Sequence, residues 1–191
     1  PMPRIERSPD DLIFLYTGGT TGLPKGVMWR HRDLLRVLSQ SYQAIGEVPN
    51  DAAEAGVLAK RMRDMGLSGP LLAAAPMMHG MAWFTSMGRL LVGSTVVSLA
   101  KRSFDAHELW SLVQAHKVAM CVIVGDAFAR PILRALEGSG GALADGLASL
   151  KVMISSGTMW SPEVKAGLLR HAPNLMCVDS YGSSEGLGYG T

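Results

Sequence analysis

Short, continuous apolar runs alternate along this chain with segments in which apolar residues recur every three or four positions. The continuous runs predict β-strands over 11–16, 27–29, 71–75, 95–99, 118–124, 152–155 and 175–179. The helical spacing predicts α-helices over 34–45, 81–91, 106–117, 127–136 and 162–171. Strand and helix patterns therefore take turns from the first third of the chain to its end.

This alternation predicts an α/β fold. Strands that are apolar throughout are buried on both sides, which is typical of a largely parallel sheet covered by helices. Right-handed crossovers then place the strand ends, and any ligand, along one edge. Two segments fall outside the pattern: 50–70 is polar and predicts a surface excursion, and 137–144 is glycine-rich and predicts a flexible connector.

Composition narrows the class of protein. The 191 residues are enough for one domain with a sizeable core, and 48% hydrophobic against 18% charged residues excludes a disordered segment. The net charge of +2 gives no basic footprint for nucleic acid, and no apolar run has the roughly 18 residues that a membrane span needs. Glycine is in excess, with 22 copies that cluster and do not repeat.

The two cysteines, Cys121 and Cys177, stand inside apolar runs. Both are expected to be buried, reduced thiols and not a disulfide or a metal site. We therefore expect a cytoplasmic protein, peripheral to a membrane at most. No signal peptide is visible, although the sequence opens at Pro1 and its absence carries little weight.

The loop within 16–27 (YTGGTTGLPKGV) carries the most chemical information. Its glycines let backbone N–H groups converge on an anion, its threonines add hydroxyl donors, and its lysine adds a charge suited to phosphate. The loop differs from a Walker A motif because Pro24 precedes Lys25, Gly26 follows it, and the next element is a strand. A glycine-rich hairpin with a solvated lysine is the bland alternative, which this dense order of Gly, Thr, Pro and Lys disfavours.

Residues 16–27 resemble the phosphate-loop signature of the adenylate-forming superfamily, which includes acyl-CoA synthetases, luciferases and the adenylation domains of peptide synthetases. Gly18 stands where that signature usually has serine, which removes one hydroxyl donor but keeps the amide. The resemblance implies that one group of loop residues binds the ATP phosphates: Thr17, Gly18, Gly19, Thr20, Thr21, Gly22 and Lys25.

Two later stretches resemble motifs of the same superfamily. Residues 76–80 (PMMHG) are similar to the segment whose histidine borders the acid pocket, which implies an acid pocket formed by His79, Gly80 and Trp83. Taken alone, this histidine could equally be a satisfied residue at a helix start. Residues 154–163 (ISSGTMWSPE) are similar to the stretch whose glycine turn meets adenine, which assigns Gly157 and Thr158 to the nucleotide. The end of this stretch is also an ordinary helix start.

Residues 179–185 (DSYGSSE) resemble a third superfamily motif. It implies that Tyr181 stacks on adenine, that Asp179 and Gly182 line the AMP site, and that Ser184 meets the α-phosphate. Glu185, together with Ser184, would hold Mg²⁺, a hard cation that prefers such oxygens. The same stretch satisfies the G-x-S-x-G pattern of serine hydrolases, but no histidine or acid follows Gly186 to complete a triad.

The resemblance runs from about residue 11 to the end and implies the function. ATP, Mg²⁺ and coenzyme A would serve the conversion of a carboxylic acid, expected to be a fatty acid, into an acyl-adenylate and then a thioester. Alternatives are a ligase that loads a carrier protein, an amino-acid adenylation domain, and a non-catalytic nucleotide-binding module. No acidic residue in the pocket segment would meet an α-amino group, which disfavours amino acids.

The expected domain is a partial AMP-binding domain over 1–191, part of the large N-terminal domain of such an enzyme. The superfamily's ribose-binding aspartate, hinge and C-terminal lid with its catalytic lysine lie downstream of the last motif, so no catalytic residue is assigned. We expect the chain by itself to be inactive, to bind nucleotide weakly, and to be able to self-associate through exposed sheet edges. The acid's identity, the thiol acceptor and the oligomeric state stay open.

Overall fold

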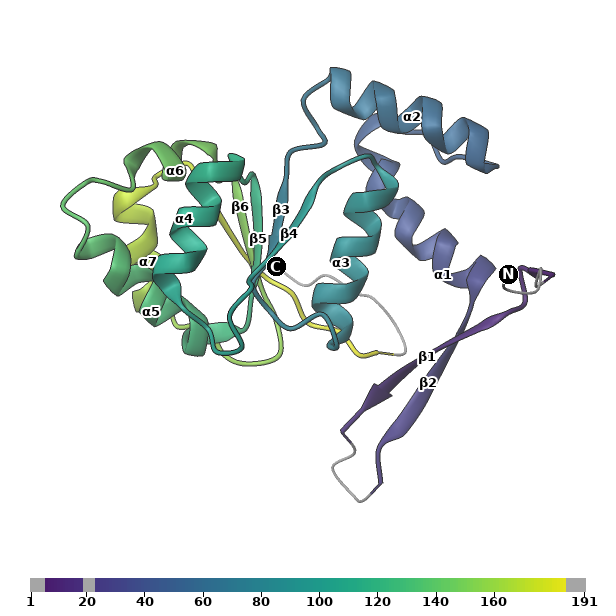
Figure 1. Ribbon diagram of the computed structural model, residues 1–191, viewed down its shortest axis with the longest axis horizontal. Helices are drawn as coiled ribbons and strands as arrows, with labels where there is room; N and C mark the ends of the chain where they lie inside the picture. Colours follow the sequence, from purple (N-terminus) through teal and green to yellow (C-terminus); the bar gives the residue numbers. More distant parts are fainter. Residues whose placement is uncertain (1–5, 19–22, 185–191) are drawn as a thin grey trace.

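A five-stranded sheet forms the centre of the computed structural model, which describes residues 6–18 and 23–184. The strand order is β4-β3-β5-β6-β7 and every neighbouring pair is parallel (Figure 1). This confirms the predicted parallel sheet. The strands are β3 (Leu71–Ala73), β4 (Val96–Ser98), β5 (Met120–Ile123), β6 (Val152–Ser155) and β7 (Met176–Asp179).

Helices cover both faces of this sheet. One face carries α4 (Ala106–His116), α5 (Gly125–Glu137), α6 (Ala144–Ser149) and α7 (Pro162–His171), and the other carries α3 (Gly80–Leu91) (Figure 1). Outside α3 lie α1 (His31–Leu38), the 3-10 helix η1 (Ser39–Ile45) and α2 (Ala52–Asp64). The molecule thus has three layers, as the apolar strands predict.

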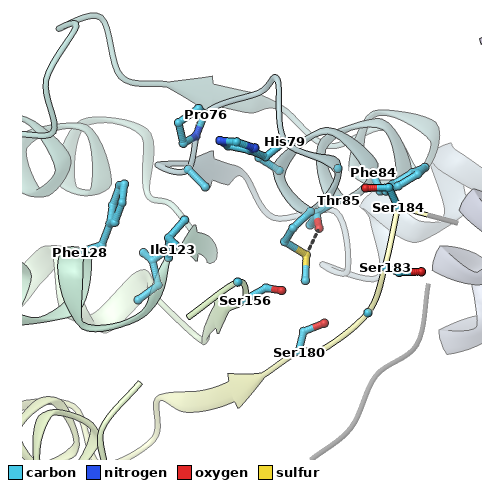
Figure 2. Close-up of a pocket in the computed structure, with 17 residues that line it drawn as sticks. Pro76, His79, Phe84, Thr85, Ile123, Phe128, Ser156, Ser180, Ser183 and Ser184 are labelled. Carbon is cyan, nitrogen blue, oxygen red and sulfur yellow. Dashed lines mark hydrogen bonds between the residues drawn. The ribbon is translucent and has the colours of Figure 1, made fainter. Parts of the chain in front are cut away.

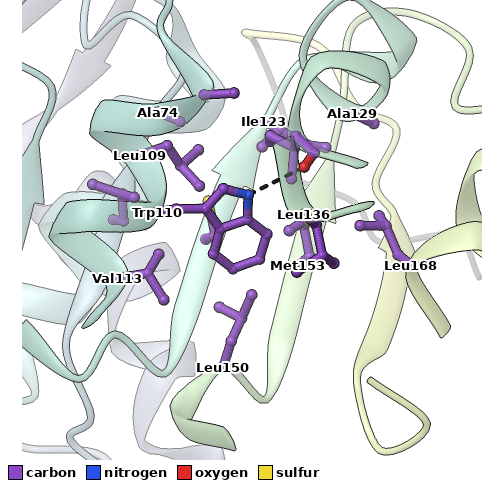
Figure 3. Close-up of a cluster of buried hydrophobic side chains, with 14 of the residues drawn as sticks. Ala74, Leu109, Trp110, Val113, Ile123, Ala129, Leu136, Leu150, Met153 and Leu168 are labelled. Atoms are coloured by element: carbon purple, nitrogen blue, oxygen red, sulfur yellow. Dashed lines mark hydrogen bonds between the residues drawn. The ribbon is translucent and has the colours of Figure 1, made fainter. Parts of the chain in front are cut away.

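The main core lies between the sheet and the α4–α7 layer (Figure 3). Trp110 of α4 lies at the centre of this core and is only 1% exposed. Its indole N–H donates to the carbonyl of Ile132 at 3.1 Å. Around it, Leu109, Met153 and Leu168 are fully buried. The opposite face has only small clusters, such as the one that contains Leu71, Ala75, Ala82 and Val122.

The order of the strands places a crevice beside β3. From β3 the chain passes through α3 to β4 on one side, and then returns through α4 to β5 on the other side. The helices that follow β3 and β5 lie on opposite faces, so the carboxyl ends of these two strands border an opening. In open α/β sheets this reversal of strand order is where ligands bind.

A hairpin stands apart from the main sheet. Strands β1 (Leu12–Thr17) and β2 (Lys25–Arg30) pair antiparallel, from Leu12 opposite Arg30 to Thr17 opposite Lys25. The two strands form a ribbon that projects away from the helices (Figure 1), and the predicted phosphate-binding residues Thr17 and Lys25 stand at its ends. The sequence predicts both strands, and the glycine-rich hairpin that was disfavoured there describes how they pair.

Most residues of 50–70 are exposed, as the predicted surface excursion requires, but the segment is not irregular, because α2 occupies most of it. Asp51 caps the helix by accepting from the Glu54 N–H at 2.8 Å, and Leu58 and Met62 are buried against Tyr42 of η1. The helix predicted over 34–45 is α1 followed by η1. In the predicted connector 137–144, α5 ends at Glu137, and α6 starts at Ala144 without having been predicted.

Both thiols are free, and burial raises the pKa of Cys121 to about 12. Cys177 is half-buried, and burial raises its pKa as well. Within residues 6–18 and 23–184, no helix is long and apolar enough to cross a membrane.

Candidate nucleotide and acid site

A cavity of about 450 Å³ opens at the carboxyl ends of the strands; we call it the strand-end cavity. It occupies the crevice between β3 and β5, with α3 on one side and α5 on the other (Figure 2). Its lining comes from four segments that are distant in the sequence: Ala75, Pro76, His79, Gly80, Met81, Ala82, Phe84, Thr85, Ile123, Val124, Phe128, Ser156, Gly157, Ser180, Gly182, Ser183 and Ser184.

The lining divides into an apolar part and a hydroxyl-rich rim. Ile123 and Phe128 stand opposite Phe84, while the hydroxyls of Ser156 and Ser180 follow β6 and β7 (Figure 2). Among the described lining residues, only one has a titratable side chain, His79. The cavity can therefore take an apolar group deep inside, with hydrogen-bonding partners at its rim.

The turn after β3 places His79 and Gly80 at the mouth. The His79 N–H donates to the Pro76 carbonyl at 3.0 Å, and His79 is the N-cap of α3 with an exposed side chain. A Cβ on Gly80 would lie 3.3 Å from the Phe84 ring and 3.6 Å from Ser184 Oγ. Glycine at this position thus lets the start of α3 approach the segment after β7 closely.

The turn after β6 contains the predicted adenine residues Gly157 and Thr158. Gly157 has φ of +89°, a conformation that glycine adopts readily, and it lines the cavity. Thr158 packs against Gly125, where an added Cβ would lie only 2.1 Å from the threonine Oγ1. The side chain of Thr158, in the turn after β6, therefore contacts the backbone of Gly125, in the turn after β5. The absence of a Cβ on Gly125 makes this contact possible.

Asp126 fastens the same two turns together. Its carboxylate accepts from the Ser161 N–H at 2.9 Å and from Arg130 at 2.7 Å, while its own N–H donates to the Met159 carbonyl at 3.0 Å. The hydrogen bond from the Ser161 backbone is the main reason that the pKa of Asp126 is lowered. Asp126 thus holds the segment that follows Thr158, at Met159 and Ser161, a role that the sequence analysis did not assign.

The segment after β7 brings Ser184 to the cavity. The Ser180 N–H donates to the Ser155 carbonyl at 2.8 Å, which extends the sheet pairing by one residue. Farther on, the Trp29 indole N–H donates to the Ser184 carbonyl at 2.8 Å, and its ring meets the Phe84 ring edge-on at 5.7 Å. The projecting hairpin is therefore tied to the cavity wall through Trp29.

The other predicted AMP residues have different surroundings. Gly182 lines the cavity, whereas Asp179 forms an ion pair with Lys165 and is not part of the lining. Tyr181 is 80% exposed, so its ring is available to a planar ligand from solvent. Trp83 does not line the cavity either, since it packs edge-on against Phe84 with ring centroids 5.3 Å apart.

The predicted phosphate-binding residues are carried by the hairpin. Thr17 and Lys25 are paired across it, with Thr17 Oγ1 3.4 Å from the Lys25 carbonyl, and neither they nor Gly18 line the cavity. Gly19, Thr20, Thr21, Gly22 and Glu185 lie outside the described residues. Within the described part of the chain, no three acidic, histidine or cysteine side chains gather as a metal site.

The cavity thus unites His79, Gly80, Gly157, Gly182 and Ser184 from three separate motifs. Sequence reasoning missed Trp29, Asp126 and Phe128, whose roles depend on contacts between distant segments. Only the serines near Gly182 had a signal, because they sit inside a motif already singled out.

The comparison of sequences finds closely similar proteins. The chain is 41% identical over 192 residues to the 3-oxocholest-4-en-26-oate–CoA ligase of Rhodococcus rhodochrous, which covers 97% of this chain and 33% of that protein. It is 40% identical over 188 residues to a medium/long-chain-fatty-acid–CoA/3-oxocholest-4-en-26-oate–CoA ligase of Mycolicibacterium smegmatis, covering 96% of this chain and 32% of the relative. The chain therefore spans about a third of the length of these relatives.

Solved structures share the fold at lower identity. A malonyl-CoA ligase with methylmalonyl-CoA and AMP bound matches with a TM-score of 0.70 and 20% identity, over 97% of this chain and 35% of that one. The inhibitor-bound N-terminal domain of FACL13 from Mycobacterium tuberculosis matches with a TM-score of 0.67 and 24% identity, over 96% of this chain and 40% of that chain.

These likenesses agree with the family model. The model described as AMP-binding enzyme matches residues 1–191, the whole of the chain. The four motifs of the sequence fall within this match, and the strand-end cavity unites residues from the three that follow β3, β6 and β7. The chain belongs to the AMP-binding enzyme family.

Proposed function

We propose that the intact protein containing this chain activates a hydrophobic carboxylic acid with ATP and passes the acyl group to coenzyme A. The observation that carries the proposal is the strand-end cavity, which combines an apolar interior with a rim of serine hydroxyls at the carboxyl edge of the sheet. An acid buries its chain in such an interior while its carboxylate stays at the rim. Membership of the AMP-binding family supports the nucleotide half of this reaction.

In the proposed reaction the carboxylate attacks the α-phosphate of ATP, which forms the acyl-adenylate and releases pyrophosphate. A thiol then displaces AMP. His79 at the start of α3 orients the carboxylate, and the turn at Gly157 and Thr158 meets the adenine, with Tyr181 stacked on its face. Positioning of the two reactants accounts for much of the acceleration in such transfers.

The hairpin and the Ser184 segment serve the phosphates in this proposal. Thr17, Lys25 and the loop between them bind the β- and γ-phosphates, with Lys25 contributing a positive charge. The serine-rich rim around Ser184 fits oxygen-rich ligands, and Ser184 with Glu185 would hold Mg²⁺. When bound, the ion neutralises charge at the phosphates.

The lining of the cavity supports a hydrophobic acid over an amino acid. No acidic side chain is among the described lining residues, so an α-ammonium group would enter without a counter-charge. The named relatives are ligases for fatty acids and for 3-oxocholest-4-en-26-oate, and we propose that the substrate is an acid of this long, apolar class.

Acid-dependent ATP–pyrophosphate exchange by the intact protein tests the proposal. Long-chain acids should support exchange, and coenzyme A should then yield the thioester. Lys25→Ala should slow exchange, whereas Lys60→Ala, which removes an exposed lysine paired with Asp64 on α2, should not. The proposal would be overturned if only amino acids supported exchange, or if no carboxylic acid supported it. Transfer of the acyl group only to a carrier protein would overturn the second half of the proposal.

A further inference from the structure

A second cavity of about 280 Å³ lies farther along α3; we call it the α3 cavity. It is enclosed by α1, η1, α3 and the strands β5 and β6. Phe84 and Thr85 line both this cavity and the strand-end cavity, so the two adjoin at these side chains. The residues of the α3 cavity are Val37, Leu38, Gln40, Ser41, Gln43, Phe84, Thr85, Gly88, Arg89, Met120 and Ile154.

The two cavities follow one face of α3. Gly80 and Met81 border the first, Gly88 and Arg89 border the second, and Phe84 with Thr85 stands between them, which is the spacing of a single helical stripe. At 1.5 Å per residue, Gly80 and Arg89 are separated by about 13 Å along the helix axis. We call the two adjoining cavities, which share Phe84 and Thr85 as a common wall, the track; together they span a length that matches an extended or polycyclic acid.

Strand β5 runs beneath the same track. Ile123, at its carboxyl end, lines the strand-end cavity, and Met120, at its first residue, lines the α3 cavity. Phe84, Met120 and Ile154 continue an apolar side of the lining from one cavity to the other, while the residues of η1 give the α3 cavity a polar side. An acid whose carboxyl group is at His79 would thus extend its far end toward Arg89.

Arg89 makes the far end of the track polar. Its Nη2 donates to the carbonyls of Leu67 and Gly69 at 3.0 and 2.9 Å, while its Nε is buried and has no acceptor within the described part of the chain. No carboxylate there pairs with it either, and burial lowers the pKa of its guanidinium.

A partly buried guanidinium without a counter-charge favours an incoming acceptor. Leaving such a donor unpaired costs free energy, which a ligand oxygen can recover. Gln40 and Gln43, whose side chains carry amide donors, line the same cavity. The chemistry of the far end therefore selects an oxygen, while the rest of the track selects hydrocarbon.

We propose that the α3 cavity binds an oxygen acceptor at the far end of a long hydrophobic acid, with Arg89 as the residue that recognises it. This inference rests on the proposed function. The ligand class is an apolar acid that carries a carbonyl, hydroxyl or second carboxyl group remote from the carboxyl that reacts. A site built around a donor disfavours the analogue that lacks the oxygen, because the donor is then left unpaired.

The test compares matched acids on the intact protein. The pairs are a sterol acid with and without its ring ketone, and a straight-chain acid with and without an ω-hydroxyl, with the corresponding dicarboxylic acid as a third arm. The oxygenated member should have a kcat/KM for ATP–pyrophosphate exchange roughly tenfold or more above its plain counterpart, the scale of a hydrogen bond to a charged group. The advantage should be largest when the oxygen lies about 13 Å from the reacting carboxyl.

Variants assign this preference to Arg89. Arg89→Met should reduce the ratio between oxygenated and plain acid to about one, and Arg89→Lys should restore it in part because the cation returns. Arg36→Met removes an exposed arginine of α1 that lines neither cavity, and should leave the ratio as in the wild type. The wild-type comparison is decisive by itself if the Arg89 variants are unstable.

The outcomes separate the two proposals. If no carboxylic acid supports exchange, the proposed function is wrong, and this inference with it. If plain and oxygenated acids are used equally by the wild type, or if Arg89→Met keeps the preference, the role of Arg89 is overturned while the proposed function stands. A preference for the dicarboxylic acid over the hydroxy acid supports recognition of an anionic end, and the reverse supports a neutral acceptor.

Discussion

The two faces of the sheet are built differently. Between the sheet and α4–α7, twenty buried residues form one continuous cluster around Trp110. On the opposite face, the buried residues divide into small clusters; the α3 cavity lies on this face, and the strand-end cavity opens beside it at the carboxyl ends of the strands. Dense packing stabilises a fold, whereas a binding site requires unfilled space. The first face therefore supplies stability and the second provides room for ligands.

The largest expected effect comes from removing a large side chain from the core between the sheet and α4–α7, which we call the dense face. Trp110→Ala should lower the free energy of unfolding by about 3–5 kcal/mol, because it leaves a cavity and removes the hydrogen bond to the Ile132 carbonyl. Urea denaturation of the intact protein measures this change. Leu35→Ala on α1, at a side chain that is 52% exposed, should stay within about 0.5 kcal/mol. Similar losses for the two variants would contradict the contrast between the faces.

A second prediction concerns the close contact between the turns. Gly125→Ala should cost about 1–3 kcal/mol, since φ is +47° and the new Cβ would lie 2.1 Å from Thr158 Oγ1 and 2.5 Å from the Met159 carbonyl oxygen. Gly56→Ala is the matched control, because that helical glycine has open space around it and should gain about 0.5–1 kcal/mol. Thermal unfolding of both variants measures the difference, and a stable Gly125→Ala protein would show that the two turns are not in contact.

A smaller effect is expected where the hairpin contacts Phe84 of α3 and the segment after β7. Trp29→Phe keeps an aromatic ring beside Phe84 but removes the hydrogen bond to the Ser184 carbonyl, a change worth about 0.5–1.5 kcal/mol. We expect the KM for ATP to rise severalfold, because the hairpin carries Lys25. Met28→Leu, on the exposed neighbouring position of the same strand, serves as the control. An unchanged KM in Trp29→Phe would mean that this contact does not position the hairpin.

The smallest effect lies at the surface of the dense face. Asp105 caps α4, and its hydrogen bond with Lys101 is the main reason that its pKa is lowered to about 2. Since the folded-state pKa is depressed, the stabilisation is present above pH 4 and is lost as the pH falls from about 4 to 2. Acid titration followed by circular dichroism should show a smaller loss of stability in this range for Asp105→Asn. An identical acid profile would assign the loss to other carboxylates.

The sheet was predictable because its strands are buried on both faces, so runs such as 118–124 and 152–155 carry no polar interruption. Helix α2 was not, because charged residues interrupt the apolar ones along its sequence and one of its larger apolar residues, Val57, is exposed. Its burial depends on Tyr42 from η1, a tertiary contact that leaves no trace within 50–70. The element boundaries also moved by one or two residues, as at β5.

The site was predictable only as far as its motifs reach. His79, Gly157 and Ser184 were each assigned from a local pattern, and the fold brings all three to one cavity. Phe128 and Arg89 belong to no motif. Phe128 reaches the cavity through the position of α5, and Arg89 stands out only because its guanidinium is partly buried without a carboxylate in the described residues. Such properties depend on packing and cannot be inferred from spacing.

Hydrogen exchange of the intact protein, with and without a long-chain acid and a non-hydrolysable ATP analogue, tests the contrast between the faces most directly. The account predicts new protection along α3, at the turn around Gly157 and in the segment 180–184, with little change in α4 and α6. Protection confined to α4 and α6, with none along α3, would contradict it.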